Sequence, residues 1–452
     1  SVIQERTHAY ALKSSMLLLD PRPDLGQMVN MVEHGFRLSE ASNMPVMMEL
    51  RIRACHVRGQ FVAKDNQAPK LSKKHLINEP AGFNYMKLAH PPVTFAQEKR
   101  KVEHRLPAAR QYIAEQRLNE HFEGSRHRHL GLIVQGGLYN TLMRALQQFD
   151  LADAFGVSSL SVLVLNVTYP LVPDELVNFC KDKSAVLLLE EGQPEYIEQE
   201  LATLLRRADI QTPLHGKDLL PRAGEYTAEV MANGLAAFIE RHLPEATAQA
   251  ALASARQWLQ GNAQRRSAVG SALSAPLPAR PPGMCIGCPE RPVFSALKLA
   301  QQDVGPVHIA GDIGCHALAT FEPFSFGHSI LGYGMSLASR AGVSPVMKRR
   351  VLSVMGDGGF WHNGLLTGVQ SALFNGDDAV LLIFKNGYTS ATGTQDIIST
   401  PDDDATDQAS DKQASLAHTN QTIETTLKGL GVKWMRTVNT YEVETMRATL
   451  TE

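Results

Sequence analysis

Two apolar runs that end in polar residues hold the most informative chemistry of the sequence. Val351-Leu-Ser-Val-Met355 leads into Gly356-Asp357-Gly358, and the run Val380–Phe384 is followed by Asn386. The 27 residues between Gly358 and Asn386 suffice for one crossover helix and a return strand. We therefore expect Asp357 and Asn386 at the carboxyl ends of neighbouring parallel strands, where open α/β sheets bind their ligands.

The residue types at these strand ends favour a magnesium ion on a diphosphate. One carboxylate, one amide oxygen, a backbone carbonyl and water suit Mg²⁺, which prefers oxygen ligands and often bridges to phosphates. The glycines Gly356, Gly358 and Gly359 let backbone N–H groups approach a diphosphate, and the following helix N-terminus adds a favourable potential. An aspartate in a glycine-rich turn is common by itself. The asparagine at this spacing, followed by Thr389-Ser-Ala-Thr392-Gly, makes the pattern specific.

The five cysteines divide into two groups. Their odd number and low density argue against the disulfide framework of a secreted protein. Cys285, Cys288 and Cys315 fall within 31 residues, and C-x-x-C with a third cysteine after a strand is a plausible set of soft ligands. Structural thiols or a zinc site are the alternatives. Cys55 and Cys180 have apolar neighbours in the sequence, and we expect both in the core.

These motifs together resemble a known family. Gly356-Asp-Gly358 with Asn386 resembles the thiamine-diphosphate motif, in which the carbonyl of the residue two past the asparagine, here Tyr388, also binds Mg²⁺. Cys285-Ile-Gly-Cys288 and the later Ala310-Gly-Asp-Ile-Gly-Cys315 resemble the thiamine-binding domain of 2-oxoacid:ferredoxin oxidoreductases. In that family three such thiolates bind a [4Fe–4S] cluster.

The resemblance covers nearly the whole chain and is strongest to the indolepyruvate group, as the thiamine-binding part of a longer, fused polypeptide. It implies further cofactor contacts at Gly311, Asp312 and Gly314, and at Thr389 and Thr392. The family's activating glutamate is expected upstream of Ser1, and its fourth cluster cysteine beyond the last residue. A non-cysteine fourth ligand, or no bound cluster, are the other accounts.

The activity implied by the resemblance is oxidative decarboxylation of a 2-oxo acid, with an aryl pyruvate such as indolepyruvate favoured. Thiamine diphosphate and Mg²⁺ are the expected cofactors, coenzyme A takes the acyl group, and electrons pass through the cluster to ferredoxin. A gamma-type catalytic subunit or fused domain is an expected partner, and a homo-dimer or higher oligomer is the expected assembly.

Four further side chains are candidates for catalysis. Arg53 and His56 follow the apolar run Val46–Leu50, where they would pair with a substrate carboxylate. His362, five residues after Asp357, and His316, next to Cys315, are candidates for proton transfer. The alternative for Arg53 and His56 is a surface position at a strand end, and for the other two histidines a supporting hydrogen bond.

Strands and helices that alternate along the chain must position these residues. Strand-like runs alternate with helical patterns, which predicts an α/β fold of several doubly wound parallel-sheet domains with a thiamine-diphosphate-binding fold at the C-terminal end. We expect the following parts: 1–60, the C-terminal part of a pyrimidine-side domain; 61–128, a linker; 129–265, a transketolase-C-like α/β domain; 266–282, a Pro/Ala-rich linker; 283–452, the diphosphate-side domain.

Composition excludes several classes of protein. The 452 residues carry a formal net charge of −2, which gives no whole-chain case for nucleic acid or an anionic membrane surface. No apolar run approaches the roughly 18 residues of a membrane helix, and we expect a cytoplasmic protein. Two rival functions remain. One is a non-redox thiamine-dependent 2-oxoacid decarboxylase or carboligase, and the other is a non-catalytic scaffold subunit.

Overall fold

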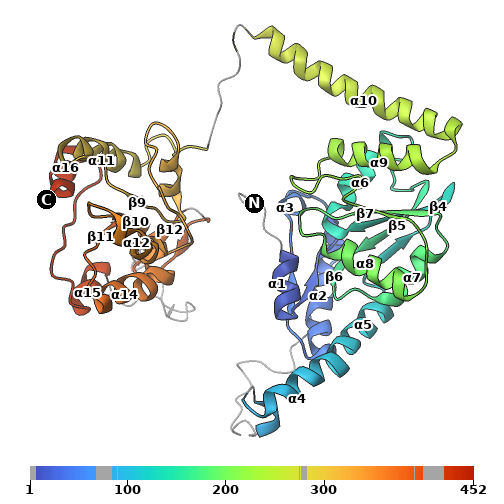
Figure 1. Cartoon of the computed structure of the whole chain (residues 1–452), viewed down its shortest axis with the longest axis horizontal. Helices are drawn as coiled ribbons and strands as arrows, with labels where there is room; N and C mark the ends of the chain where they lie inside the picture. Colours follow the sequence, from blue (N-terminus) through green and yellow to red (C-terminus); the bar gives the residue numbers. More distant parts are fainter. Residues whose placement is uncertain are drawn as a thin grey trace. The chain divides into compact units, whose positions relative to one another are not determined.

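The chain forms two compact units, Ser1–Ala275 (unit 1) and Pro276–Glu452 (unit 2) (Figure 1). The computed structural model describes residues 7–67, 84–88, 90–273, 275, 282–390, 392–400 and 422–452. The predicted α/β fold with parallel sheets is confirmed. The finer division into five parts stays a prediction, and 68–83 and 276–281 of its two linkers lie outside the described residues.

Unit 1 is built on a five-stranded sheet in the order β3-β5-β4-β7-β8. Only β3 at the edge is antiparallel to its neighbour, because the other pairs are joined by helical crossovers. The strands are β3 (Glu120–Phe122), β4 (His127–Gln135), β5 (Leu160–Leu165), β7 (Ala185–Leu189) and β8 (Leu214–His215).

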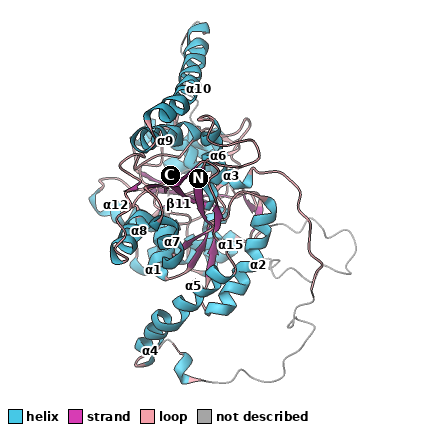
Figure 2. Ribbon diagram, turned by 90° about the vertical axis from the view of Figure 1, so that its right-hand side faces the viewer, coloured by secondary structure: helices cyan, strands magenta, loops and turns pink. Residues whose placement is uncertain are grey.

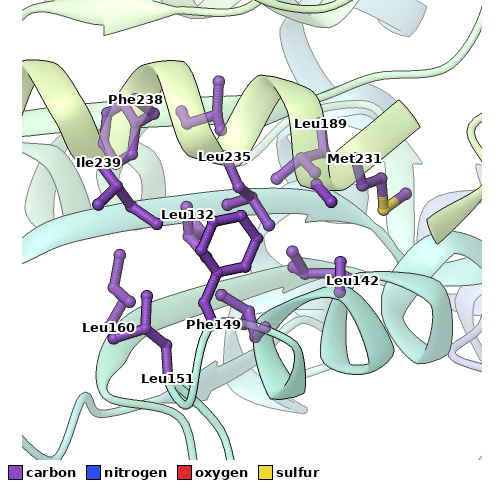
Figure 3. Packing of buried hydrophobic residues seen from close by; sticks show 14 of the residues in the cluster. Leu132, Leu142, Phe149, Leu151, Leu160, Leu189, Met231, Leu235, Phe238 and Ile239 are labelled. Atoms are coloured by element: carbon purple, nitrogen blue, oxygen red, sulfur yellow. The ribbon is translucent and has the colours of Figure 1, made fainter. Parts of the chain in front are cut away.

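Helices cover both faces of this sheet. Alternate residues of the central strands point to opposite faces, so Leu132 packs under one helical layer and Ile133 under the other. One layer is α6 (Tyr139–Gln147), α9 (Ala228–His242) and the start of α10 (Glu245–Ala272); the other is α7 (Pro173–Lys181) and α8 (Tyr196–Arg207). Figure 3 shows Phe149 among Leu132, Leu235 and their neighbours in the first layer. This burial on both faces explains the nearly uninterrupted apolar runs of β5 and β7.

A second sheet joins the first sixty residues to the rest of unit 1. Its order is β2-β1-β6, with β1 (Leu17–Leu19) parallel to β2 (Val46–Met48) and antiparallel to β6 (Val167–Tyr169). The crossover helix α2 (Leu25–Ser42) begins at Asp24, whose side chain accepts the backbone N–H of Gln27. α2 packs against α5 (Leu106–Glu115) over a core that includes Leu38 and Ile113.

Asp20, which forms a buried ion pair with Arg51, also links the first sixty residues to the turn after β4. Asp20, 1% exposed, accepts the guanidinium of Arg51 at 2.9 Å and the backbone N–H of Gly137 at 3.1 Å. A Cβ atom at Gly136 would overlap the carbonyl of Asp20, and one at Gly137 would overlap Arg51. The glycine pair after β4 is therefore required for close packing between two segments of unit 1.

The remaining described elements of unit 1 are short apart from α10. They are α1 (Thr7–Ser14), α3 (Ile52–Cys55), η1 (Tyr85–Lys87), α4 (Val93–Arg100), the π-helical η2 (Lys101–Arg105) and η3 (Gly136–Leu138). α10 continues to Ala272, past the predicted linker boundary at 266, because Gln264 to Ala272 lacks proline and Pro276 follows only later. Figures 1 and 2 show its end extending past the other helices of unit 1.

Unit 2 contains a parallel sheet in the order β11-β10-β9 with helices on both faces. The strands are β9 (Ile309–Ala310), β10 (Leu352–Gly356) and β11 (Val380–Phe384), with a small hairpin of β12 (Tyr388–Thr389) and β13 (Gln395–Asp396). The helices are α11 (Glu290–Val304), η4 (Cys315–Thr320), α12 (Ser336–Val343), η5 (Ser344–Val346), α13 (Asp357–Gly359), the π-helical η6 (Phe360–Gln370), α14 (Ser371–Asn375), α15 (Ile423–Gly429) and α16 (Val443–Thr451).

Among the described residues, no helix combines the length and the apolar character that crossing a membrane requires.

Candidate functional site

The three strands of unit 2 end at one edge, and each is followed by residues predicted to act. β10 pairs in parallel with β11 and with β9. Asp357 comes directly after β10, Asn386 lies two residues after β11, and Cys315 lies five residues after β9. The prediction that Asp357 and Asn386 follow neighbouring parallel strands is confirmed.

Asp357 is a buried carboxylate, 2% exposed, held by backbone N–H groups. Its Oδ1 accepts the N–H of Gly358 at 2.9 Å, and its Oδ2 accepts those of Asn386 at 2.8 Å and Gly387 at 2.7 Å. Burial raises the pKa of the Asp357 carboxyl above its ordinary value, although these donors act in the opposite direction. A nearby cation would offset this burial cost.

Asn386 sits in a tight turn after β11. Its Oδ1 accepts the backbone N–H of Tyr388 at 3.3 Å, and the intervening Gly387 has a φ of 85°. That backbone conformation favours glycine, which explains the Asn-Gly pair in the sequence. Asn386 and Tyr388 are both exposed, so the amide oxygen and the Tyr388 carbonyl belong to a loop at the surface.

Small residues keep the start of the helix after β10 close to its neighbours. A Cβ atom on Gly358 would overlap the hydroxyl groups of Thr389 and Tyr333, which lie 3.5 Å apart. A Cβ on Gly359 would come within 2.6 Å of Oδ2 of Asp312. The glycines of the motif thus bring backbone close to polar side chains, as a diphosphate site needs.

A small cavity of about 30 Å³ gathers many of the predicted residues. Its described lining includes predicted cofactor, magnesium and thiolate positions: Gly314, Gly356, Gly358, Gly359, Thr389, Asp357, Asn386, Tyr388 and Cys315. This volume admits an ion with its water but not a whole thiamine cofactor. Oxygen donors on two adjacent strands around such a space fit a magnesium ion in donor type.

Three predicted cofactor contacts do not line this cavity. Asp312 is fully buried, and its Oδ1 accepts the N–H of Gly334 at 2.8 Å. Burial raises the pKa of Asp312 to about 6, and its Oδ2 has no hydrogen-bond partner among the described residues. Gly311 packs against Ile330, and Thr392 donates its hydroxyl to Gln395 at 2.6 Å.

The three clustered cysteines are placed unequally. Cys315 lies in the cavity with its sulfur 3.7 Å from the Ser390 hydroxyl, and its charge contributes to the raised pKa of Cys288, for which burial is the largest cause. Cys285 is exposed. In the described part of the chain, no three His, Cys, Asp or Glu side chains are grouped to hold a metal. Cys288 donates its backbone N–H to the Cys285 carbonyl at 3.2 Å, and the role of the three thiols as cluster ligands stays a prediction.

Of the two cysteines expected in the core, the structure confirms one. Cys180 is fully buried, and burial raises the pKa of its thiol to about 12. The expectation for Cys55 is wrong, because this residue is exposed at the end of the short helix α3. The short helix buries Ala54 but leaves its apolar residue Ile52 exposed as well.

Sequence reasoning missed the titratable cavity residue Glu290 and undervalued His316. Glu290 directly follows the Cys285–Cys288 motif and is 7% exposed. Burial first, and the charge of Asp357 second, raise its pKa to about 7. Burial lowers the pKa of His316 to about 4, so its ring is neutral near pH 7. The ring stacks on Phe384, and neither nitrogen has a hydrogen-bond partner among the described residues.

Of the candidate catalytic residues, His362 belongs to unit 2, whereas Arg53 and His56 belong to unit 1. The exposed His362 ring lies 5.6 Å from that of Tyr333, itself a cavity residue. Arg53 is bound to Glu225 at 2.9 Å and to the Tyr226 carbonyl at 2.9 Å. His56 is exposed. The prediction that Arg53 and His56 meet the substrate stays a prediction.

Comparison with known proteins agrees with this geometry. Residues 292–452 match the family described as the thiamine pyrophosphate enzyme, C-terminal TPP binding domain. Subunit IorA of indolepyruvate oxidoreductase from Methanothermobacter thermautotrophicus is 26% identical over 447 residues, or 98% of this chain. The chain is similar in sequence to this subunit. The same subunit from Thermococcus kodakarensis is 24% identical over 99% of the chain.

The IorA-like chain spans 64% and 65% of the length of these two relatives. A solved structure of 2-oxoglutarate:ferredoxin oxidoreductase from Magnetococcus marinus, with 2-oxoglutarate, coenzyme A and succinyl-CoA bound, is also similar in part. It is 16% identical, with a TM-score of 0.23 over 32% of this chain and 23% of that chain. This likeness is too weak to bear on function.

Proposed function

We propose that this chain is the thiamine-diphosphate-binding part of a 2-oxoacid:ferredoxin oxidoreductase that acts on aryl pyruvates such as indolepyruvate. The observation that carries the proposal is the meeting of Asp357, Asn386 and Cys315 around one cavity. It unites the oxygen donors of a magnesium diphosphate site with a thiol of the predicted cluster. The IorA-like sequence supports the choice of substrate class.

The proposed reaction converts a 2-oxo acid, coenzyme A and two oxidised ferredoxins into an acyl-CoA, CO2, two reduced ferredoxins and a proton. Bound thiamine diphosphate supplies the electron sink for loss of CO2. Asp357, Asn386 and the Tyr388 carbonyl would hold Mg²⁺, and backbone N–H groups near Gly358 would face the diphosphate. Cys285, Cys288 and Cys315 would be thiolate ligands of the [4Fe–4S] cluster.

The protonation states of two cavity residues suit acid–base work near neutral pH. Glu290, with a pKa of about 7, exchanges a proton in the working range of most enzymes. His316 stays neutral, so it adds no positive charge beside the thiols. We assign proton exchange to Glu290 before His316, whose lowered pKa keeps its ring neutral, and before His362, which does not line the cavity.

Other parts of the proposed assembly follow from the resemblance. The relatives are named as subunits, which supports a partner such as a gamma-type subunit or a fused domain. The proposed homo-oligomer and the cytoplasmic location rest on the sequence expectation alone.

Calorimetric titration of the full chain with thiamine diphosphate tests the binding part of this proposal. We expect saturable binding that requires Mg²⁺ and is lost in Asp357→Ala. Asp378→Ala is the matched control, because Asp378 is exposed and pairs only with Arg350 among the described residues. Binding without Mg²⁺, or equal binding by the Asp357 variant, would contradict the proposal.

A non-redox thiamine-dependent decarboxylase or carboligase is the second candidate, favoured by the exposure of the Cys285 thiol, one of the three thiolates that the cluster would require. Anaerobic purification separates the two functions. A brown protein with iron and sulfide, which reduces ferredoxin when given indolepyruvate and coenzyme A, supports the oxidoreductase. A colourless, iron-free protein that releases CO2 without an electron acceptor supports the second candidate.

A further inference from the structure

A larger cavity lies in unit 1, at the N-terminal ends of α6 and α9 and beside α10. Its volume of about 850 Å³ is within the usual range of small-molecule sites, roughly 300–1,000 Å³. It shares no lining residue with the unit 2 cavity. Its walls come from segments far apart in the sequence, with Arg53 at one side and Arg266 at another.

Positively charged side chains predominate in the lining of this larger cavity, which we call the groove. Its described lining contains four arginines and one carboxylate: Arg53, Arg144, Arg265, Arg266 and Glu229. Arg266 pairs with Glu229 at 2.8 Å, and Arg53 pairs with carboxylates outside the groove.

The other two arginines have no acidic partner. Arg144 and Arg265 form no ion pair with any described residue, and Arg265 binds only the amide oxygen of Asn262. Two guanidinium groups are thus available to an anion, and guanidinium binds phosphate with paired N–H donors.

The starts of two helices complete the lining. Asn140 and Thr141, in the first turn of α6, line the groove, as do Thr227 and Ala228 at the start of α9. α6 continues directly from the turn η3, so the positive charge of the groove comes from its arginines and not from a free helix end.

An aromatic ring completes the groove. Trp258 is half-buried against the core of unit 1 and lies on α10, four residues before Asn262 and seven before Arg265. This spacing places the three side chains on one face of the helix. A tryptophan ring beside arginines offers a flat apolar surface to a planar heterocycle whose charged groups reach the guanidinium groups.

The wall formed by α10 is fastened in place. Glu229, in the first turn of α9, accepts the amide of Asn262 at 2.9 Å as well as the guanidinium of Arg266. These two bonds hold the middle of α10 over the start of α9. The groove is therefore a formed feature of unit 1, with its single carboxylate already neutralised by an arginine.

We propose that this groove binds a nucleoside diphosphate or a closely related phosphorylated nucleoside. Its phosphates would lie against Arg144, Arg265 and the start of α6, and its base against Trp258. A site of this kind would let a nucleotide bind to unit 1 independently of the thiamine chemistry proposed for unit 2.

Titration of the full chain with ADP, followed by tryptophan fluorescence, tests this proposal. We expect saturable quenching that is absent in Trp258→Phe. The double variant Arg144→Ala/Arg265→Ala should weaken binding by about tenfold or more, since each charge-assisted bond contributes substantially. Arg256→Ala is the matched control on α10, because Arg256 is exposed, pairs with Glu240 at 3.6 Å and does not line the groove. Both arginines of the double variant are at the surface, and its melting temperature should equal that of the control.

Further ligands and one variant separate this site from the others. Adenosine and inorganic pyrophosphate should each bind more weakly than ADP, and Asp357→Ala should bind ADP as the unaltered chain does. Lack of ADP binding, equal ADP affinity in the double variant, or pyrophosphate binding as tight as ADP would each overturn the proposal. Loss of ADP binding in Asp357→Ala would also overturn it, because the nucleotide would then occupy the unit 2 site.

Discussion

Oδ2 of Asp357 accepts the backbone N–H of Asn386 at 2.8 Å, so the two predicted magnesium ligands are joined directly. The bond ties the end of β10 to the loop after β11. One side chain thereby positions the other ligand in addition to offering its own oxygen.

This relationship predicts how the two ligands differ on substitution. Asn386→Ala should weaken Mg²⁺-dependent thiamine diphosphate binding by about tenfold, since one oxygen ligand is lost while the backbone bond to Asp357 remains. Asp357→Asn should abolish binding and also lower stability by about 1–3 kcal/mol, because an amide replaces the acceptor of three backbone N–H groups, two of them buried. Calorimetric titration and urea unfolding measure the two effects. Equal stability losses in both variants would contradict this account.

Gly358→Ala should destabilise unit 2 by about 1–3 kcal/mol, because the added methyl group overlaps the hydroxyls of Thr389 and Tyr333. Gly342→Ala on α12 is the control, with open space around its Cβ position. The control should stabilise the chain by up to about 1 kcal/mol through helix propensity. Thermal unfolding measures the stability of the two variants. An unchanged melting temperature in Gly358→Ala would contradict the prediction, because it would show that the neighbouring side chains move aside at little cost.

The raised pKa of the Asp312 carboxyl predicts that the free energy of unfolding depends on pH. The carboxyl has a folded-state pKa of about 6 against an ordinary value of 3.8, because burial disfavours the charged form. The folded state thus keeps a proton that the unfolded state loses, and stability falls as the pH rises from about 4 to 6. The shift of about two units corresponds to at most about 3 kcal/mol. In Asp312→Asn this fall should disappear. Unfolding free energies of the unaltered chain and of Asp312→Asn, measured from pH 4 to 8 without added metal, test this difference. The same pH dependence in both proteins would refute the prediction.

Substitution of a predicted cluster cysteine should lower the iron content of the protein. Cys315→Ser should remove most of the bound iron and sulfide from anaerobically prepared protein, because this thiol lies in the cavity beside Ser390. Cys288→Ser should do the same. Cys55→Ser is the control, since Cys55 is an exposed thiol far from the motif in sequence. Iron content unchanged in Cys315→Ser would remove this thiol from the ligand set.

Asp20→Ala should destabilise unit 1 by about 3–5 kcal/mol, because it leaves the buried guanidinium of Arg51 without its main partner. The pKa of Arg51 is already raised by Asp20 against the opposing effect of burial. Glu240→Ala, at an exposed position, should change stability by less than about 0.5 kcal/mol. Chemical unfolding of both variants measures the difference, and a small effect at Asp20 would mean that water or Glu191 replaces the lost partner.

Local sequence patterns predicted the edge of the unit 2 sheet well. The run Val380–Phe384 is a strand from end to end, and the 27-residue spacing places Asn386 beside Asp357 as expected. Such runs are reliable because burial on both faces demands apolar residues throughout.

Features that depend on distant segments were beyond sequence reasoning. Glu290 and His316 owe their unusual pKa values to burial, which no local pattern reveals. Gly136-Gly137 was visible in the sequence, but its cause is the close approach of Asp20 and Arg51, which lie 117 and 86 residues before Gly137. Cys55 was misplaced because apolar neighbours in sequence do not ensure burial in a short surface helix.

The pairing of β1 with β6 has a practical consequence for dissecting the protein. A break in the backbone near residue 60 would separate two strands that satisfy each other's N–H and C=O groups. Neither piece would then fold by itself, and each would expose a strand with unpaired N–H and C=O groups, on which other chains can assemble. Fragments meant for expression should therefore keep β1 and β6 in one piece.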